Sequence, residues 1–315
     1  MATIPEVLAS ALQHHQAGRF QEAEALYRQI LQAEPNHADA LHLYGVIAHQ
    51  AGRHDVAIRH ISQAIACNPL DARYHNNIGE AYRAQGKLEE AAGHYRQALT
   101  LRPVYAEARL NLGTVLKGQG RMAEAVVEYE QALSANPSYA EAHNNLGNAF
   151  QELGKMEAAI ACYQQALALK PDYMTAHSNL GGALKGQGKL EEAMACYRRA
   201  LAINPGDASV HSNMLFVMCY SPASTVEALA MAHREWNDRH GRPLASQIRP
   251  HNNDRTLERR LRVGYVSADL WGHAVGHFVE PLFANHNRTN VMVFAYSNGV
   301  HVDATTKRLR ELTDG

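Results

Sequence analysis

Histidine is the residue type that could bring the most chemistry to this chain, which has 19 histidines among 315 residues. Neutral imidazole is a common metal ligand, so a shared metal site is the first possibility. Four histidines occupy one position of a 34-residue period, and equivalent positions on packed helices lie about 8–10 Å apart, too far to share a metal through bonds of about 2.1 Å. His14 and His15 have no companion ligand at a metal-binding spacing. We therefore expect packing roles and no metal for these histidines; the four are His75, His143, His177 and His211.

Asparagine recurs with the same 34-residue step, inside segments that are expected to be helical. Asparagine is a poor helix former by about 0.5 kcal/mol, so its recurrence there needs a reason. Each asparagine precedes a small packing residue by two positions (a leucine in the last case), which is about 200° around a helix and directs the amide into a concave groove. Amides both donate and accept hydrogen bonds, so a row of them can hold a peptide backbone; a solvated face or bonds to the adjacent repeat is the alternative. The predicted ladder consists of Asn77, Asn111, Asn145, Asn179 and Asn213.

The elements that position these side chains are read from the period itself. Proline, glycine, alanine and tyrosine columns all recur every 34 residues, with two amphipathic helices in each unit, such as AEAHNNLGNAFQEL and KMEAAIACYQQALAL. In that unit Gly154 permits the turn and Pro171 ends the second helix. Gly147 and Ala159 allow close approach, and Tyr163 fills the space between the helices. The pattern resembles the tetratricopeptide repeat.

We count six full repeats over residues 4–207 and a seventh first helix, which predicts a right-handed solenoid over 4–220. In such arrays each unit contacts only its neighbours, and the first helix of each unit (helix A) lines the concave surface. This part of the chain is therefore expected to bind protein or peptide segments in its groove and to be free of strands.

Composition excludes several functions. Lysine plus arginine number 30 against 31 acidic residues, so the chain lacks the bulk positive field of a nucleic-acid binder. No window approaches the apolar length of a membrane span, and the N-terminus lacks the features of a secretory signal. Four cysteines without a CxxC motif or a suitable pair indicate free thiols and a cytoplasmic protein. We expect neither nucleic acid nor membrane as a partner.

After Tyr220 the periodic columns stop. Residues 221–260 predict a helical connector, with Ser224 or Thr225 as N-cap, followed by an arginine-rich linker. From 261 to 315 the segments LRVGYVSAD, GHFVEPLFANH, NVMVFAYSN and HVDATTKRLRELTDG alternate as strand, helix, strand and helix. This order predicts the start of a parallel, doubly wound α/β lobe without a dinucleotide-binding glycine motif.

The segments HSNMLFVMCY, HREW, LRVGYVSADLWGHAVGHF and NVMVFAYSN together resemble the SPINDLY-type O-linked N-acetylglucosamine transferases. In that family a tetratricopeptide superhelix precedes a two-lobed, Rossmann-like glycosyltransferase of the GT-B architecture. The most diagnostic stretch is G-Y-V-S-x-D-(x)3-H, here Gly264 to His273. The overall expectation is a mainly α chain, with a solenoid followed by a truncated first lobe.

The resemblance implies transfer of N-acetylglucosamine from UDP-N-acetylglucosamine to serine or threonine hydroxyls of proteins. It implies that His273 is a catalytic base or a contact to the acceptor, and that His277 is a second site position. A histidine beyond the carboxyl end of a parallel strand is well placed for such a role, because ligands bind there and imidazole titrates near neutral pH. We expect Asp269 to order the same loop. No tightly bound cofactor and no metal are expected.

The lobe is incomplete, since only 55 residues remain from Leu261 onward and the family needs two lobes. We therefore expect an amino-terminal portion of the enzyme, which would not catalyse transfer alone. Two alternatives stay open: a non-catalytic tetratricopeptide scaffold for protein interactions, and an O-fucosyltransferase of the same family. The GYVSADLWGH segment argues against the scaffold, because a scaffold has no need of an α/β lobe with this loop.

Overall fold

The computed structural model describes residues 3–247, 256 and 259–315. The chain forms two compact units, Met1–Ala245 and Ser246–Gly315. Within the described residues, no helix has both the length and the apolar character needed to cross a bilayer.

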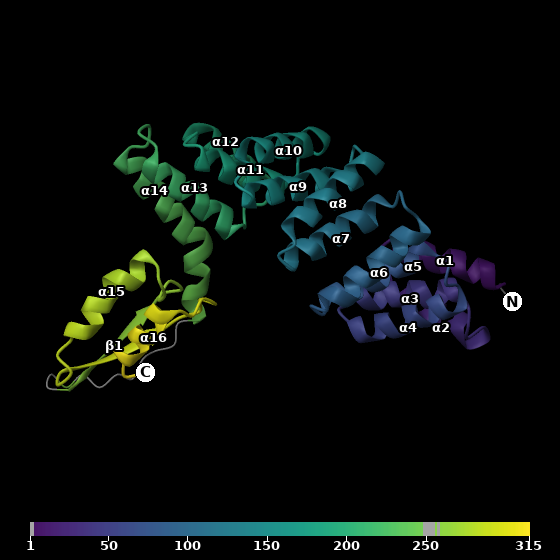
Figure 1. The fold of residues 1–315 in the computed structure, drawn as a ribbon, viewed down its shortest axis with the longest axis horizontal. Coiled ribbons are helices and arrows are strands. Elements are labelled where there is room, and N and C mark those ends of the chain that lie inside the picture. Colours follow the sequence, from purple (N-terminus) through teal and green to yellow (C-terminus); the bar gives the residue numbers. More distant parts are fainter. Residues whose placement is uncertain (1–2, 248–255, 257–258) are drawn as a thin grey trace. The chain divides into compact units, whose positions relative to one another are not determined.

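The first unit consists of helix pairs that follow one another along the chain (Figure 1). Residues 4–207 form six such pairs without a strand, as the sequence predicts. Helix A of a pair is followed after a short turn by helix B, and the two pack together. The A helices are α1 (Ile4–Gln16), α3 (Ala38–Gln50), α5 (Ala72–Ala84), α7 (Ala106–Gly118), α9 (Ala140–Glu152) and α11 (Met174–Gly186); the B helices are α2 (Phe20–Ala33), α4 (His54–Cys67), α6 (Leu88–Leu101), α8 (Met122–Ala135), α10 (Met156–Leu169) and α12 (Leu190–Ile203).

The turn between the paired helices depends on a glycine with a left-handed backbone. Gly154 has φ +73°, which only glycine adopts without a steric cost. This conformation lets the Lys155 N–H reach back to the Phe150 carbonyl at 2.8 Å and satisfy a helix-end oxygen. The same glycine column has positive φ in all six repeats: Gly18, Gly52, Gly86, Gly120, Gly154 and Gly188.

In the second to the sixth pair, a glycine on helix A receives a large side chain from helix B. A Cβ built on Gly147 would lie 2.6 Å from the Tyr163 ring, so a side chain there would have to displace the ring or force the helices apart. Tyr163 is fully buried, together with Ala159 one turn earlier. The second repeat keeps this arrangement with Ile61 against Gly45. Close helix packing therefore uses the glycine, alanine and tyrosine columns seen in the sequence.

Successive repeats contact each other through both kinds of helix. Each B helix packs on the next A helix, and the A helices from α3 to α11 also touch the following A helix. The array continues with α13 (Ala208–Tyr220), which packs on α12 and α11 as a seventh helix A.

The connector begins with α14 (Val226–Trp236), which packs against α13. Its N-cap is Thr225, whose hydroxyl accepts the Ala228 N–H at 3.2 Å. A π-helical turn (Asn237–Gly241) and a 3₁₀ turn (Arg242–Gln247) follow. Most of the arginine-rich linker predicted before residue 261 lies outside the described residues.

The second unit contains two parallel strands and two helices in the predicted alternating order. They are β1 (Leu261–Val266), α15 (Ala274–Asn285), β2 (Val291–Tyr296) and α16 (Ala304–Glu311). The strand register runs from Leu261 opposite Val291 to Val266 opposite Tyr296. A small core of Leu270, Phe283, Val293 and Leu309 lies between the sheet and the helices.

The outer edge of β2 is partly paired as well. The Asp314 N–H donates to the Val293 carbonyl at 2.7 Å, and the Ala295 N–H donates to the Gly315 carbonyl at 2.9 Å. The Asp314 carboxylate also accepts the Val293 N–H and forms an ion pair with Arg288. Residues 314–315 thus occupy the position of a third strand, so β2 lies between them and β1, as in the first half of a doubly wound sheet.

Candidate functional site

The predicted asparagine ladder lies on successive A helices. Four of its side chains are half-buried and the last is exposed, so each amide keeps part of its polar surface accessible. The amide is a two-way hydrogen-bonding group, so an accessible row can both donate and accept. The members, in order from α5 to α13, are Asn77, Asn111, Asn145, Asn179 and Asn213.

Buried asparagines of the preceding repeat hold two of these amides. The Asn111 amide nitrogen donates to Asn76 Oδ1 at 3.1 Å, and that of Asn179 donates to Asn144 Oδ1 at 3.0 Å. Asn76 is 0% exposed and Asn144 is 2% exposed, so these bonds lie in a dry environment. Bonds to the adjacent repeat, the alternative considered from the sequence, therefore use one N–H of each amide and leave its oxygen available.

Sequence reasoning missed this second row of asparagines. Its signal is the Asn–Asn pair, which occurs at 76–77 and again at 144–145, two repeats later. The repeat between them has Leu110 at the equivalent position. Because Leu110 and Ser178 stand between and after the two asparagines, the second row does not form a column of identical letters.

The second repeat replaces the buried asparagine by His42, which is 4% exposed. Its Nε2 lies 2.8 Å from the amide nitrogen of Asn77, and its ring packs on Tyr74 at 4.5 Å. Burial lowers the pKa of His42 to about 4, and the nearby Arg73 guanidinium acts in the same direction. The imidazole is therefore neutral near pH 7 and serves as a hydrogen-bonding group of the ladder.

A pocket of about 290 Å³ opens beside the middle of the ladder, between α7 and α9. Its lining includes Thr114, Lys117 and Asn145. Lys117 Nζ pairs with Glu152 Oε1 across the two helices at 2.6 Å. The Asn145 amide thus faces open space next to an ion pair that is already satisfied.

Two members of the histidine column contact the turn before their own A helix. His143 Nε2 lies 3.1 Å from the Pro137 carbonyl, and His177 Nε2 lies 2.9 Å from the Pro171 carbonyl. Arg109 replaces histidine in the fourth repeat and makes the equivalent contact to its own proline carbonyl. These are structural contacts between a side chain and the backbone six residues earlier.

In the second unit, the loop after β1 carries the predicted site histidines. His273 is the N-cap of α15, and its Nδ1 accepts the Val275 N–H at 3.3 Å. The Asp269 carboxylate lies 4.0 Å from the same nitrogen. His277 lies one helical turn further on, and all three side chains are exposed. The loop thus brings His273, Asp269 and His277 to one end of the sheet.

Ser267 and Asp303 hold this loop, in the role predicted for Asp269. The Ser267 hydroxyl accepts the Asp269 N–H at 3.0 Å, whereas the Asp269 carboxylate makes no hydrogen bond among the described residues. Asp303 caps α16 and also accepts the Gly272 N–H at 2.7 Å, which ties the loop after β1 to the loop after β2. Backbone hydrogen bonds, first that from Thr306, hold the pKa of Asp303 below its usual value.

The two loops contact each other at further points. Gly299 lies against the Ala268 carbonyl, where a Cβ would be 2.1 Å away. The rings of Trp271 and His301 are 4.9 Å apart, and those of Trp271 and His273 are 5.6 Å apart. The carboxyl ends of both strands are therefore covered by one joined layer of loops.

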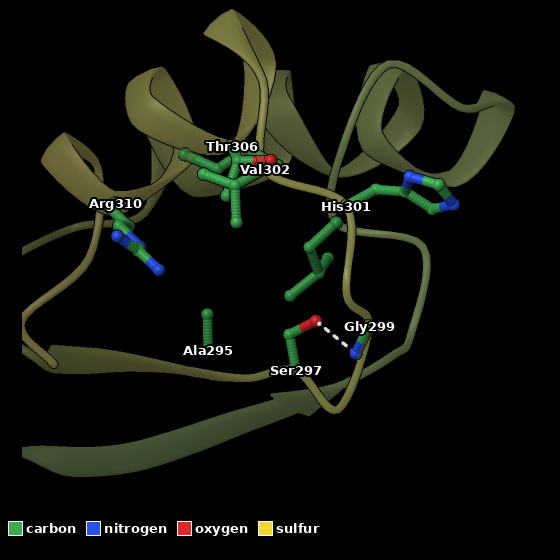
Figure 2. Close-up of a pocket in the computed structure, with 9 residues that line it drawn as sticks. Ala295, Ser297, Gly299, His301, Val302, Thr306 and Arg310 are labelled. Atoms are coloured by element: carbon green, nitrogen blue, oxygen red, sulfur yellow. Dashed lines mark hydrogen bonds between the residues drawn. The ribbon is translucent and has the colours of Figure 1, made fainter. Parts of the chain in front are cut away.

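A pocket of about 190 Å³ lies under this layer, between β2 and α16 (Figure 2). Figure 2 shows Arg310 pointing into it from α16, while the His301 ring turns away. Ser297 lines the pocket and its hydroxyl accepts the Gly299 N–H at 3.2 Å. Leu270 and Val302 supply apolar walls. A guanidinium and a hydroxyl in this setting can bind a small polar group; sequence reasoning missed both, although the SNG segment after β2 was a possible signal.

Comparison with known families divides the chain at the end of the solenoid. Residues 14–77, 79–120, 115–154, 147–188 and 175–207 match models of the tetratricopeptide repeat. Residues 211–314 match the model described as "Glycosyl transferase family 41". The family-41 match includes most of α13, the connector and the loop with His273.

Curated relatives match over a limited length. The tomato protein (Solanum lycopersicum) named "Probable UDP-N-acetylglucosamine--peptide N-acetylglucosaminyltransferase SPINDLY" is 39% identical over 97 residues, which is 31% of this chain and 10% of the relative. The corresponding SEC protein of Arabidopsis thaliana is 49% identical over 39 residues, 12% of this chain and 4% of the relative. The matches thus span about a tenth of these relatives or less.

The solved structures that are similar to the chain include an O-GlcNAc transferase and PilF. A mutant O-GlcNAc transferase of Thermobaculum terrenum is 32% identical, with a TM-score of 0.55 over 66% of this chain and 40% of that one. Pseudomonas aeruginosa PilF has a TM-score of 0.61 over 69% of this chain and 97% of its own, but at 19% identity it shows the fold alone.

The chain is thus a tetratricopeptide-repeat solenoid followed by a segment, residues 211–314, that matches the model of glycosyl transferase family 41. Within that class it resembles the SPINDLY-type O-linked N-acetylglucosamine transferases, as its motifs predict.

Proposed function

We propose that the chain is the acceptor-binding region and the opening of the first catalytic lobe of a protein O-N-acetylglucosaminyltransferase. The proposal rests on one combination: an accessible row of amides lies on the A helices, and the same chain continues into the segment that matches family 41, residues 211–314. The donor would be UDP-N-acetylglucosamine, and the acceptors serine or threonine hydroxyls of proteins. We propose no metal and no tightly bound cofactor.

The ladder would bind the acceptor through its backbone. Asn111 and Asn179 each keep an oxygen and one N–H after bonding to the preceding repeat. An extended segment offers alternating carbonyl and N–H groups, which match these free donors and acceptors. The contact would therefore tolerate many sequences, a property that suits an enzyme with varied protein substrates.

His273 would contact the acceptor or the donor through Nε2. Its Nδ1 accepts the cap hydrogen bond from Val275, so the neutral ring carries its proton on Nε2. In this state Nε2 donates a hydrogen bond to a substrate oxygen. To act as a base through Nε2, the ring would have to carry its proton on Nδ1. The hydrogen bond from Val275 would then have to break, and Nδ1–H would face the Asp269 carboxylate, which lies 4.0 Å away. The geometry favours the contact over proton abstraction.

Changing Asn111, Asn145 and Asn179 together to alanine tests the proposal. Each lost amide contact is worth roughly 0.5–1.5 kcal/mol, so the loss of three should reduce the affinity for an unfolded protein acceptor by about 10-fold or more. Binding is measured by fluorescence anisotropy with the 315-residue chain. Transfer and donor hydrolysis are measured side by side with a longer protein, in which this chain is followed by the remainder of a two-lobed glycosyltransferase.

Donor hydrolysis should be unchanged in the triple variant, and His273→Ala should show the reverse pattern, with acceptor binding retained and transfer reduced. A triple variant that binds and glycosylates protein as well as the parent would show that the A-helix face is not the acceptor site. Absence of any transfer by the extended parent would favour the non-catalytic scaffold.

A further inference from the structure

The last helix A differs from the others in what it presents beside the ladder. Phe216 and Tyr220 on α13 are 51% and 65% exposed, with ring centroids 4.9 Å apart. The two preceding repeats have Asn148 and Gly182 at the Phe216 position. Two large aromatic side chains thus replace small or polar residues at the end of the A-helix row.

These rings border a pocket of about 400 Å³ between α11 and α13. Lys185, Leu190, Phe216, Val217 and Tyr220 line it. The Lys185 ammonium lies 5.1 Å from the centre of the Phe216 ring, at the distance of a cation–π contact. The pocket therefore combines an apolar wall with one positive charge.

An internal comparison shows that this charge lacks the partner its counterpart has. Lys117 occupies the same repeat position two repeats earlier and pairs with Glu152 at 2.6 Å. The position equivalent to Glu152 is Tyr220, 68 residues later. Among the described residues, no carboxylate lies within ion-pair distance of Lys185. One repeat junction is thus closed by an internal ion pair, and the other is open to an external carboxylate.

We propose that the pocket formed by Lys185, Phe216 and Tyr220 binds an acidic residue and a large apolar residue of an acceptor segment. The carboxylate would pair with Lys185, and the apolar side chain would pack against the two rings. The occupant follows from charge complementarity and from continuity with the ladder, because Asn179 and Asn213 lie on the same two helices. The inference rests on the proposed function, that this face binds protein segments.

The geometry also gives the spacing of the two residues. In an extended segment, side chains two positions apart point to the same side and lie about 6.6 Å apart. This separation suits a carboxylate on the Lys185 ammonium and an apolar group on the ring 5.1 Å from it. The recognised pattern is therefore acidic–any–apolar, which adds selectivity to a ladder that reads only backbone.

The test uses fluorescein-labelled twelve-residue Gly/Ser peptides that carry Glu-Ser-Leu, Gln-Ser-Leu or Glu-Ser-Ala at the centre. Their affinities for the 315-residue chain are measured by anisotropy at low and high salt. We expect the Glu-Ser-Leu peptide to bind about 3- to 10-fold more tightly than the Gln peptide and about 10-fold more tightly than the Ala peptide, because a charge pair and a buried leucine are lost, respectively. Salt should reduce the first difference.

Two variants test the assignment to Lys185. Lys185→Met keeps the apolar stem and should abolish the preference for Glu over Gln. Tyr220→Glu gives Lys185 the internal partner that Lys117 has, so it should also abolish the preference. The matched control is Lys117→Met, which should leave the ratio unchanged. All three side chains are at least partly exposed, and circular dichroism melting confirms the fold.

Equal binding of the Glu and Gln peptides by the parent chain would overturn the proposal, as would an equal effect of Lys117→Met and Lys185→Met. Concentration-dependent dimerisation that Phe216→Ser abolishes would show that a second copy is the occupant and would also overturn it. The asparagine triple variant separates the two proposals, because it should weaken all peptides without changing their ratio. If that variant binds like the parent while Lys185→Met still removes the preference, the pocket stands and the ladder fails.

Discussion

The solenoid and the α/β lobe both depend on glycines, but the glycines meet different obstacles. In the solenoid, a Cβ at Gly147 would meet the edge of the Tyr163 ring at 2.6 Å. In the lobe, a Cβ at Gly276 would meet the Trp271 carbonyl oxygen at 2.0 Å. A ring on a side chain can shift into a neighbouring repeat, whereas a carbonyl within a tight loop cannot move alone. The solenoid should therefore absorb damage locally, and the lobe should fail as a unit.

The strongest test of this difference is Gly276→Ala. Because the methyl group would overlap a backbone oxygen, we expect the lobe to lose about 3 kcal/mol or more. Hydrogen exchange followed by mass spectrometry should show faster exchange across β1, β2 and α16 together, with the solenoid amides unchanged. Exchange confined to the loop after β1 would contradict the view that the lobe unfolds as a unit.

Acid should have the opposite effect to Gly276→Ala, because it should destabilise the solenoid before the lobe. Burial lowers the pKa of His42 to about 4, below its usual 6.5, so the unfolded chain binds this proton more readily than the folded chain does. The stabilisation is complete above pH 6.5 and is lost as the pH falls toward 4, by about 3 kcal/mol for His42 alone. Burial also lowers the pKa of four other histidines in repeats two and three, which are His49, His60, His75 and His94.

Urea unfolding at pH 7 and pH 5 measures this effect. The matched variant is His42→Asn, which places at position 42 the residue found at the equivalent positions 76 and 144. It should remove the part of the difference between the two pH values that is due to His42. In the lobe, the lowered pKa of Asp303 means that its support is lost only as the pH falls below the usual aspartate value of 3.8. This prediction would be contradicted if, as the pH is lowered, the lobe unfolded before repeats two and three.

The smallest of these effects is expected inside the repeats. Gly147→Ala should cost about 2 kcal/mol, because the Tyr163 ring must move. Gly93 on α6 is the matched control, since a Cβ there meets nothing within 4 Å. Gly93→Ala should therefore stabilise the solenoid by about 0.5–1 kcal/mol through helix propensity. Denaturant midpoints of the two variants give the comparison, and equal shifts would show that glycine packing does not limit the repeats.

The same contrast explains what could be predicted from the sequence. The Gly147–Tyr163 contact recurs in other repeats with the same spacing, so one chain supplies several copies of the evidence. Thr225 was also predictable as a cap, because capping depends on local sequence. The hydrogen bond from the Gly272 N–H to Asp303 joins residues 31 positions apart and is not repeated elsewhere in the sequence pattern, so it could not be predicted. Asn76 and Asn144 lie between these cases, since they recur in alternate repeats only.

The bonds from Asn111 to Asn76 and from Asn179 to Asn144 have a mechanical consequence. Each joins residues 35 positions apart, one more than the repeat length, so its length depends on how far one repeat is rotated and displaced from the next. These two hydrogen bonds therefore resist changes in the rotation and displacement between the repeats that they join. A bound segment that competes for one of these N–H groups would change the angle between the two repeats. Conversely, a force that stretches the solenoid would change the affinity for the segment.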